Sequence, residues 1–247
     1  MSTTVIETLQ NRVTIRDYTD QPIDEATLLE LLRAARRSPT SSNWQTYSMV
    51  VVRDPETKKK LAALAGNQHH IEACPVFVAL CADLTRLQCA REMHGESLGH
   101  GLDITLVATI DAALVGMSLS LAAESLGLGT VMIGSMRNDP AEAARLLGLP
   151  KGVFVVFGLC IGWPAQRPPQ KPRLPEELVI HYEQYNADPE KTVVLLREYD
   201  QKLAEHYRST GGELVADAWT VRTTRASAQP RREFLRRVLE ELGFTLD

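Results

Sequence analysis

The stretch "GVFVVFGLCIGWP", residues 152–164, is an apolar run around which the rest of the chain can be arranged. It is rich in β-branched and aromatic residues, so it predicts the central strand of a sheet. "PVFVALCA", residues 75–82, predicts a second buried strand. "SMVVV" (48–52) and "GTVMIGSM" (129–136) predict two further strands.

Helical patterns alternate with these strands as far as residue 163, which predicts an α/β or α+β core of about 160 residues. Helices are predicted at residues 3–11, 24–38, 54–66, 102–126, 139–150, 189–208 and 230–242. The helix at 102–126 is apolar almost all round, as expected for a large core or a subunit interface. After Trp163 the chain is rich in proline and predicts an extended arm, so we divide it into a core, 1–163, and an arm, 164–247. The apolar helix and the arm together favour a dimer.

Composition narrows the class of protein. The chain has 247 residues, 44% hydrophobic and 23% charged, with a net charge of −4, so a general attraction to nucleic acid or acidic membranes is not expected. No secretion signal is recognisable at the N-terminus, and acidic residues interrupt the 102–126 helix, so we expect a soluble cytoplasmic protein. The four cysteines, without CxxC spacing, are expected to be buried free thiols.

Two basic clusters suggest a local anion site. In "RVTIRDY", residues 12–18, an extended chain places Arg12, Thr14 and Arg16 on one face, and a helix would also bring the two arginines together at i, i+4. In "KPR", Lys171 and Arg173 project to one side, although a solvated surface pair is the alternative. Four converging cations would suit a phosphate.

Three polar stretches are candidates for contacts with a flat ligand. The "PTSSN" turn, residues 39–43, offers hydroxyl donors, although it would also simply end the preceding helix. "GNQHH", residues 66–70, offers Gln68 and two histidines, and a zinc site lacks further ligands there. Gly134 and Ser135, in the predicted strand 129–136, would let a flat ligand approach the backbone, or would serve close strand packing.

The sequence contains no convincing motif for hydrolase, nucleotide-binding or metal-dependent chemistry. "GESLG", residues 95–99, fits GxSxG but does not follow a buried strand, as a nucleophile elbow requires. No P-loop, GxGxxG or HExxH is present, and no metal site or nucleophile pair is predicted. A site for a phosphate and a flat polar body, with no protein acid or base, suggests that a cofactor performs the reaction.

These clusters, in this order, resemble the FMN-dependent nitroreductase family, in particular its oxygen-insensitive NADPH nitroreductase and flavin reductase branch. The likeness covers nearly the whole chain and rests on the pieces "RVTIRDYTDQPI", "SPTSSNWQTYSMVVVRD", "ALAGNQHHI", "AAESLGLGTVMIGSMRND" and "FGLCIGWPAQRPPQKPRLP". The resemblance implies an α+β, three-layer α/β/α fold with a central, mostly antiparallel sheet. It also implies an intertwined homodimer with FMN at the interface.

The resemblance also implies roles for residues at matching positions. Those expected to bind FMN are Arg12, Thr14, Arg16, Lys171 and Arg173 at the phosphate and ribityl chain, Gln68 at the ribityl or ring edge, Met132, Ile133, Gly134 and Ser135 along the ring, and Thr40, Ser41 and Asn43 from the partner subunit. FMN would take a hydride from NADPH or NADH and reduce nitroaromatics or quinones by a ping-pong mechanism. No catalytic proton-transfer residue is implied. Free flavin as the acceptor, and a non-catalytic FMN-binding redox protein, are the alternatives.

Three departures from the family concern specificity. The branch carries arginines for the NADPH 2′-phosphate in the loop after the first helix of the arm, where this chain has Thr210, Val215 and Ala216. NADH as donor therefore stays open. Val13 replaces a second basic residue after Arg12, and Asn43-Trp44 replaces a more apolar pair.

Overall fold

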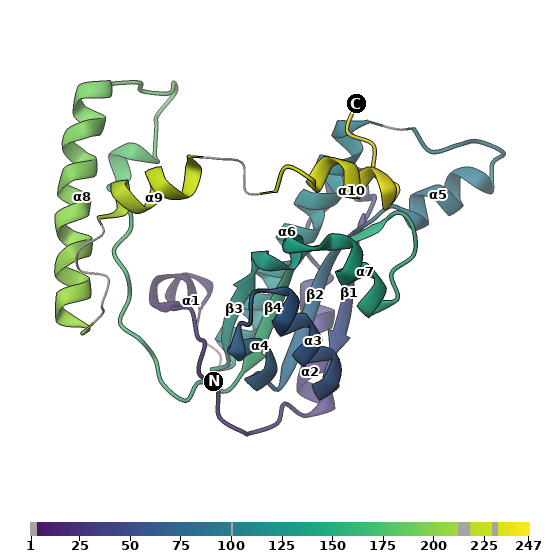
Figure 1. Ribbon diagram of the computed structural model, residues 1–247, viewed down its shortest axis with the longest axis horizontal. Helices are drawn as coiled ribbons and strands as arrows, with labels where there is room; N and C mark the ends of the chain where they lie inside the picture. The colour runs from purple at the N-terminus through teal and green to yellow at the C-terminus, as the bar shows by residue number, and fades with distance from the viewer. Residues whose placement is uncertain (1–3, 100, 212–217, 229–231) are drawn as a thin grey trace. The chain divides into compact units, whose positions relative to one another are not determined.

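The structure is a computed structural model of the chain, and it describes residues 4–99, 101–211, 218–228 and 232–247. The chain divides into two compact units, Met1–Pro168 with Arg232–Asp247, and Pro169–Arg231 (Figure 1). We call the first the core unit and the second the arm unit, and describe each by itself. The sequence-based division between residues 163 and 164 stays a prediction.

The core unit is built on one four-stranded sheet of order β1-β2-β4-β3. Its strands are β1 (Tyr47–Val52), β2 (Val76–Asp83), β3 (Gly129–Ile133) and β4 (Val153–Gly162). All three neighbouring pairs are antiparallel. The stretch that opened the sequence analysis therefore lies inside the sheet, between β2 and β3, and the predicted α+β class with an antiparallel sheet is confirmed.

Helices cover both faces of this sheet and make a three-layer α/β/α core, as Figure 1 shows. Along β2, Val78 and Leu80 pack with α2 (Glu25–Ala35) and α6 (Leu102–Ser125). Phe77, one residue before Val78, packs on the opposite face with α3 (Pro55–Leu64), α4 (His69–Ala73) and α7 (Pro140–Leu147). Because both faces are covered, β2 and β4 are buried along their whole length, which explains their unbroken apolar sequences.

The remaining elements correct three expectations. Gly134 and Ser135 were predicted in a strand, but β3 ends at Ile133 and a 3₁₀ helix, η2 (Gly134–Asn138), follows. The last predicted helix is shorter, α10 (Leu235–Glu241). A helix that was not predicted, α9, lies in the polar stretch before it. The other elements are α1 (Val5–Asn11), η1 (Ser41–Asn43), α5 (Thr85–Glu92), η3 (Glu176–Leu178), α8 (Pro189–Ser209) and α9 (Trp219–Ser227).

Helix α6 has two faces of different character. Nine of its residues, among them Asp111, are buried in the core. Leu106, Ile110 and Leu114 are respectively 49%, 55% and 40% exposed on the other side. In the described part of the chain α6 alone is long and apolar enough to cross a membrane, by length and composition only, and 44% of its most apolar window is buried inside the protein. That burial indicates a core helix with one uncovered apolar face.

Cysteine burial follows the expectation with one correction. All four cysteines are free thiols, and Cys74, Cys81 and Cys160 are buried, but Cys89 is exposed on α5. Within the described residues, no group of three or more His, Cys, Asp or Glu side chains is placed to hold a metal ion.

The arm unit has a much smaller core. Among its described residues, Tyr199, Leu203 and Tyr207, one turn apart on α8, are buried, and Trp219 at the start of α9 packs against them. The Asp200 carboxylate accepts hydrogen bonds from the backbone N–H and the hydroxyl of Thr220, at 3.1 and 2.5 Å. The first turn of α9 is thus capped by a side chain of α8.

Candidate active site

The segment 12–18 is extended chain and lies beside the start of the edge strand β3. Thr14 pairs with Thr130 of β3 in an isolated parallel bridge, and the Ile15 N–H donates to the Thr130 carbonyl at 3.0 Å. Ile15 is only 2% exposed and covers Gly129, where any side chain would overlap it. Arg12 and Arg16 lie on either side of Thr14 and Ile15 in this extended segment. The prediction of an extended conformation for residues 12–18 is therefore confirmed, and the helical alternative is wrong.

The two arginines of this segment have different partners. Arg12 Nη2 lies 3.1 Å from Glu124 Oε1, which also accepts from the Thr130 hydroxyl at 2.7 Å and from Ser120 at 3.2 Å. The chain itself therefore supplies an anion for Arg12. Glu124 lies 112 residues from Arg12 in sequence, and no local motif pointed to it. Arg16 is exposed and forms no ion pair within the described residues, so the uncompensated charge of the cluster is at Arg16.

His70, on α4, lies near Arg16 and has an unused nitrogen. Its Nε2 atom is buried and has no hydrogen-bond partner in the described part of the chain. Burial lowers the pKa of His70, and the nearby positive charge of Arg16 lowers it further. A buried nitrogen without a partner is costly, which indicates that a ligand atom completes this contact.

Gln68 and Ser135 lie side by side, although they are far apart in sequence. The Gln68 amide donates to the Ala65 carbonyl at 2.9 Å and to the Ser135 hydroxyl. This contact joins the loop before α4 to the start of η2. Two of the predicted FMN-binding residues are thus brought together within one unit.

Strand β3 is an edge strand, and part of its backbone is unpaired. In an antiparallel pair, the N–H and C=O of alternate residues point to the same side. Because the Thr130 carbonyl faces the 12–18 segment, the backbone of Met132 also faces away from β4. Met132 is 43% exposed, whereas Ile133 is buried. A polar ring edge could therefore meet backbone donors and acceptors here.

Two further arginines stand beside this edge, and the motif analysis missed both. The Cβ atom of any side chain at Gly134 would lie 3.5 Å from Arg137 Nη2, and Arg137 Nη1 donates to the Val156 carbonyl of β4. Arg232 donates to the Asn138 side chain at 2.8 Å. Burial lowers the pKa of Arg137, and the charge of Arg232 lowers it further. Positive charge is therefore concentrated around η2. Arg137 lies within the sequence stretch "AAESLGLGTVMIGSMRND", but nothing in that stretch indicated a role for it.

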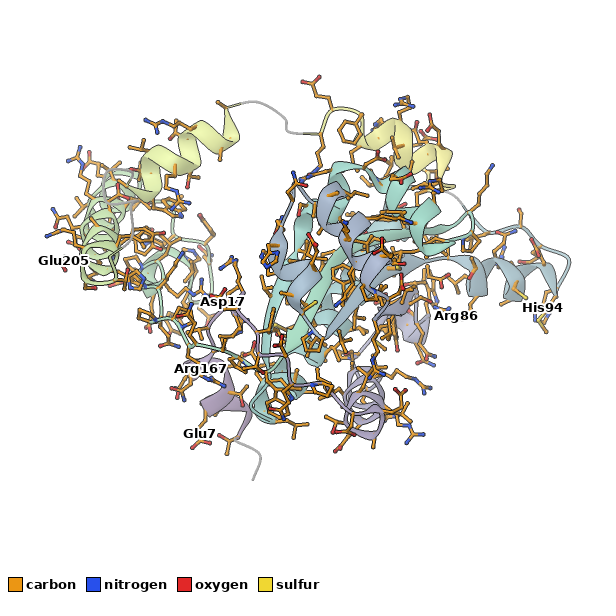
Figure 2. All side chains as sticks on the ribbon, turned by 60° about the horizontal axis from the view of Figure 1, so that its bottom comes forward. Glu7, Asp17, Arg86, His94, Arg167 and Glu205 are labelled. Carbon is orange, nitrogen blue, oxygen red and sulfur yellow. The ribbon has the colours of Figure 1, made fainter. Side chains whose placement is uncertain are left out.

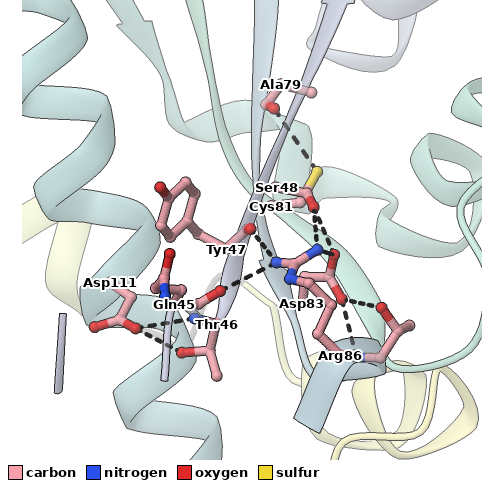
Figure 3. Close-up of polar contacts among 10 residues, drawn as sticks. Gln45, Thr46, Tyr47, Ser48, Ala79, Cys81, Asp83, Arg86 and Asp111 are labelled. Carbon is pink, nitrogen blue, oxygen red and sulfur yellow. Dashed lines mark hydrogen bonds and ion pairs between the residues drawn. The ribbon is translucent and has the colours of Figure 1, made fainter. Parts of the chain in front are cut away.

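The hydroxyl turn is held by a buried carboxylate of α6. Asp111 accepts from the Ser41 N–H at 3.1 Å, and from the N–H and hydroxyl of Thr46 at 3.1 and 2.7 Å. Figure 3 shows the hydrogen bonds from Thr46 to Asp111. Arg86, which pairs with Asp83, donates to the Gln45 carbonyl just before β1. Asn43 has a φ of 57°, a left-handed conformation that favours glycine and costs about 1–3 kcal/mol. A carboxylate that fixes such a turn is a positioning residue.

The structure does not bring all the predicted residues together within one chain. Thr40, Ser41 and Asn43 lie next to α6, on one side of the sheet, whereas Gln68 belongs with the helices on the other. No described hydrogen bond joins the turn to Arg16, Gln68 or Ser135.

The chain leaves the core unit beside the 12–18 segment. Tyr18 bridges to Pro164, and the Ala165 N–H donates to the Asp17 carbonyl at 3.0 Å. The Gln166 amide donates to the Asp17 carboxylate at 2.6 Å. In Figure 2, Asp17 and Arg167 are both labelled in this region. The exit of the core at Pro168 therefore lies close to the strand that carries Arg16.

The arm unit carries the other predicted basic pair. Lys171 and Arg173 are exposed and line a cavity of about 860 Å³. The Thr210 hydroxyl donates to the His206 carbonyl at 2.9 Å and ends α8, which leaves no cation at that position. Val215 and Ala216 lie outside the described residues.

The residues of the core unit fit a flat, phosphorylated cofactor. The uncompensated guanidinium of Arg16 suits a phosphate, and the partnerless Nε2 of His70 suits a polar ligand atom. The outward-facing backbone at Met132 and the absence of a side chain at Gly134 leave an open polar edge for a ring.

Comparison with known proteins agrees with this geometry. The nitroreductase family model matches residues 9–163, and the model of the nitroreductase family C-terminal domain matches residues 171–247. An FMN reductase [NAD(P)H] of Bacillus subtilis is 37% identical over 98% of both chains. An oxygen-insensitive NADPH nitroreductase of Salmonella typhimurium is 39% identical over 97% of both. Among solved structures, NfrA1 nitroreductase from B. subtilis superposes with a TM-score of 0.93 at 36% identity, covering 98% of this chain and 99% of that one. The NADPH:FMN oxidoreductase from Vibrio harveyi complexed with NAD⁺ gives 0.87 at 32% identity, covering 97% and 98%.

Proposed function

This chain belongs to the nitroreductase family, and from that premise we propose that it carries two electrons from NAD(P)H to nitroaromatic, quinone or similar acceptors by a ping-pong mechanism. It is an FMN-dependent oxidoreductase that takes its electrons from NAD(P)H. Bound FMN supplies the redox chemistry, because it accepts a hydride from the nicotinamide and passes two electrons to the acceptor. The observation that carries the proposal is the uncompensated Arg16 beside the partnerless Nε2 of His70.

The residues of the chain hold and orient the cofactor in this proposal. Arg16 binds the phosphate, with Arg12 and Thr14 beside it on the ribityl side. Lys171 and Arg173 are assigned to the same phosphate from the family resemblance alone. Each charged hydrogen bond contributes about 1.5–3 kcal/mol.

The ring edge of the flavin is assigned to β3, η2 and the loop before α4. The backbone of Met132 and Ile133 and the start of η2 at Gly134 line the ring. Gln68, which is already bonded to Ser135, reaches its edge. Arg137 lies next to Gly134, so its guanidinium would place a fixed positive charge near the bound ring.

A homodimer completes the site in this proposal. Leu106, Ile110 and Leu114 form an uncovered apolar stripe on α6, and the hydroxyl turn is bonded to the same helix through Asp111. A second copy packed on α6 therefore brings its own Thr40, Ser41 and Asn43 to the interface. We also place the protein in the cytoplasm, with small molecules rather than nucleic acid or membrane as partners, in keeping with its net charge of −4.

The test is spectroscopic and kinetic. Purified protein reloaded with FMN should show a flavin spectrum, and stopped-flow mixing with NADPH or NADH should bleach it without an acceptor. A nitroaromatic or a quinone should then restore the colour, and steady-state rates should give parallel double-reciprocal lines. If FMN binds but neither nicotinamide reduces it, the protein is a non-catalytic flavin binder. If only free FMN is reduced at a useful rate, it is a flavin reductase.

A further inference from the structure

A buried lysine joins helices α3 and α4 of the core unit. Lys58, on α3, is only 7% exposed, although its side chain ends in a charged group. Its Nζ atom donates to the Glu72 carbonyl at 3.0 Å and to the Cys74 carbonyl at 2.6 Å. Within the described residues Lys58 forms no ion pair. Backbone carbonyls therefore accept its hydrogen bonds, and burying such a charge is costly.

Both of these carbonyls belong to the C-terminal end of α4. The helix is only five residues long, so it is not stable by itself, and its last carbonyls have no partner inside the helix. The negative end of the helix dipole also lies there, which favours a nearby positive charge. Cys74 completes this end, because its thiol donates to the Ile71 carbonyl at 3.3 Å and its N–H to the His70 carbonyl at 3.1 Å.

The other end of α4 carries two side chains that face the candidate site. Gln68, the residue before α4, makes no side-chain capping bond to the helix, and its amide donates instead to the Ser135 hydroxyl. His70, in the first turn, has the buried Nε2 atom without a partner in the described part of the chain. With no side-chain cap at its start, α4 depends for its position on the buried Ile71 and on the hydrogen bonds at its C-terminal end.

We propose that Lys58 is a positioning residue for the flavin, which holds α4 so that Gln68 and His70 meet the bound cofactor. The inference deepens the proposed function, on which it rests. Lys58 acts through the backbone of α4 and does not itself touch the cofactor. An apolar side chain could fill the same space at a lower desolvation cost, so the two hydrogen bonds to α4 are what the lysine adds.

The experiment uses the FMN-loaded protein with no nicotinamide present. Equilibrium dialysis gives the dissociation constant of FMN, and visible circular dichroism reports the surroundings of the bound ring. Lys58→Met keeps an apolar stem of similar length but removes the charge and the donors. It should raise the dissociation constant about tenfold and change the dichroism of the flavin. If Lys58→Met does not fold, Lys58→Gln, which keeps an amide donor, takes its place.

Phe244→Ala is the control for a loss of stability alone. The Phe244 ring is fully buried against Phe154, in the apolar cluster on the other face of the sheet from α4. Both Lys58→Met and Phe244→Ala should melt at a lower temperature than wild type. Phe244→Ala should nevertheless change the dissociation constant of FMN less than twofold and leave the dichroism as it is. Equal weakening of FMN binding by the two variants would reduce Lys58 to a structural role and overturn the proposal.

A double-mutant cycle tests whether Lys58 acts through α4. In a chain that already carries Gln68→Ala and His70→Gln, Lys58→Met should weaken FMN binding by less than a further twofold. A further tenfold loss in that chain would overturn the assignment, and so would unchanged FMN binding when Lys58→Met is the only substitution. A wild-type protein that binds FMN but is reduced by neither nicotinamide would contradict only the proposed function. A wild-type protein that retains no FMN would overturn both.

Discussion

The core unit and the arm unit bury apolar surface on different scales. The sheet of the core has a buried cluster on each face, and β2 and β4 are enclosed along their whole length. Among the described residues of the arm unit, three residues of one helix are buried, Tyr199, Leu203 and Tyr207. A core of the first kind specifies its own fold, whereas one of the second kind needs a ligand or another surface to hold it in place.

The largest expected effect breaks the core. Phe77 is fully buried and fills the space over Gly158, so Phe77→Ala should lower the free energy of unfolding by about 3–5 kcal/mol. Leu203→Ala in the arm should leave the main denaturant midpoint nearly unchanged and should increase hydrogen exchange in α8 only. If Leu203→Ala lowers the main midpoint as much as Phe77→Ala does, the two units unfold together and the contrast between them is wrong.

The second effect tests the phosphate contacts proposed in the two units. Arg16→Ala and Arg173→Ala should each weaken FMN binding about 10–100-fold, because a charged hydrogen bond of about 1.5–3 kcal/mol is lost. Bound flavin per chain after dialysis gives the measurement, and the unfolding midpoint should barely move. Arg145→Ala, an exposed arginine paired with Glu142, serves as the control. Full retention of flavin in both variants would remove the phosphate assignment.

The third effect tests the hydroxyl turn. Asp111→Asn replaces one of the two carboxylate oxygens that together accept three hydrogen bonds from Ser41 and Thr46, so we expect a loss of about 1–3 kcal/mol of stability. FMN affinity should fall as well, because Ser41 is no longer positioned. Thermal unfolding and flavin fluorescence titration report the two quantities. A variant with normal stability and reduced affinity would restrict Asp111 to positioning alone.

The fourth effect sharpens the role of the arm. Thr210→Arg restores a cation at the end of α8, where the family branch carries one. An exposed charge pair is worth about 0.2–1 kcal/mol, so the ratio of kcat/KM for NADPH to that for NADH should rise by up to about fivefold. Thr210→Gln adds length without charge and should leave the ratio unchanged. Equal ratios in wild type and Thr210→Arg would show that this position does not meet the dinucleotide.

The smallest effect depends on pH. The folded-state pKa of His70 lies below its ordinary value of about 6.5, because of burial and of Arg16. As the pH falls through 6.5 the unfolded chain takes up a proton that the folded apoprotein does not, so stability decreases. Wild-type apoprotein should therefore lose more melting temperature between pH 7.5 and 5.5 than His70→Gln. Parallel losses in the two proteins would mean that His70 titrates normally.

Much of the core could be predicted because its signals are local and strong. Apolar runs in the sequence indicate β4 and α6, and the side chains of Asp24 and Asp54 cap the first turns of α2 and α3. The residues of the candidate site could be predicted from the sequence only in part. Arg16 was identified from its own segment, but Glu124, which neutralises Arg12, is brought to it by the fold alone. Asp111 is one of the acidic residues that interrupt the apolar 102–126 sequence, and nothing local indicated that it holds the hydroxyl turn.

The arm was harder to predict for a physical reason. The α9 sequence "WTVRTTRAS" is polar and has several β-branched residues, which are poor helix formers, and no capping side chain stands at its start. Its cap comes from Asp200 on α8, so the signal is tertiary rather than local. Ser135 was misassigned to a strand because nothing in "GTVMIGSM" marks where β3 ends and η2 begins.

One turn of α6 has a consequence for how the enzyme behaves at low concentration. Ile110 belongs to the uncovered apolar stripe of α6, and its neighbour Asp111 accepts a hydrogen bond from the Ser41 N–H of the hydroxyl turn. In the homodimer proposed above, association of two copies and binding of flavin would thereby be linked through adjacent residues. Dilution that separates the copies should release the cofactor, and an excess of FMN should in turn hold the copies together.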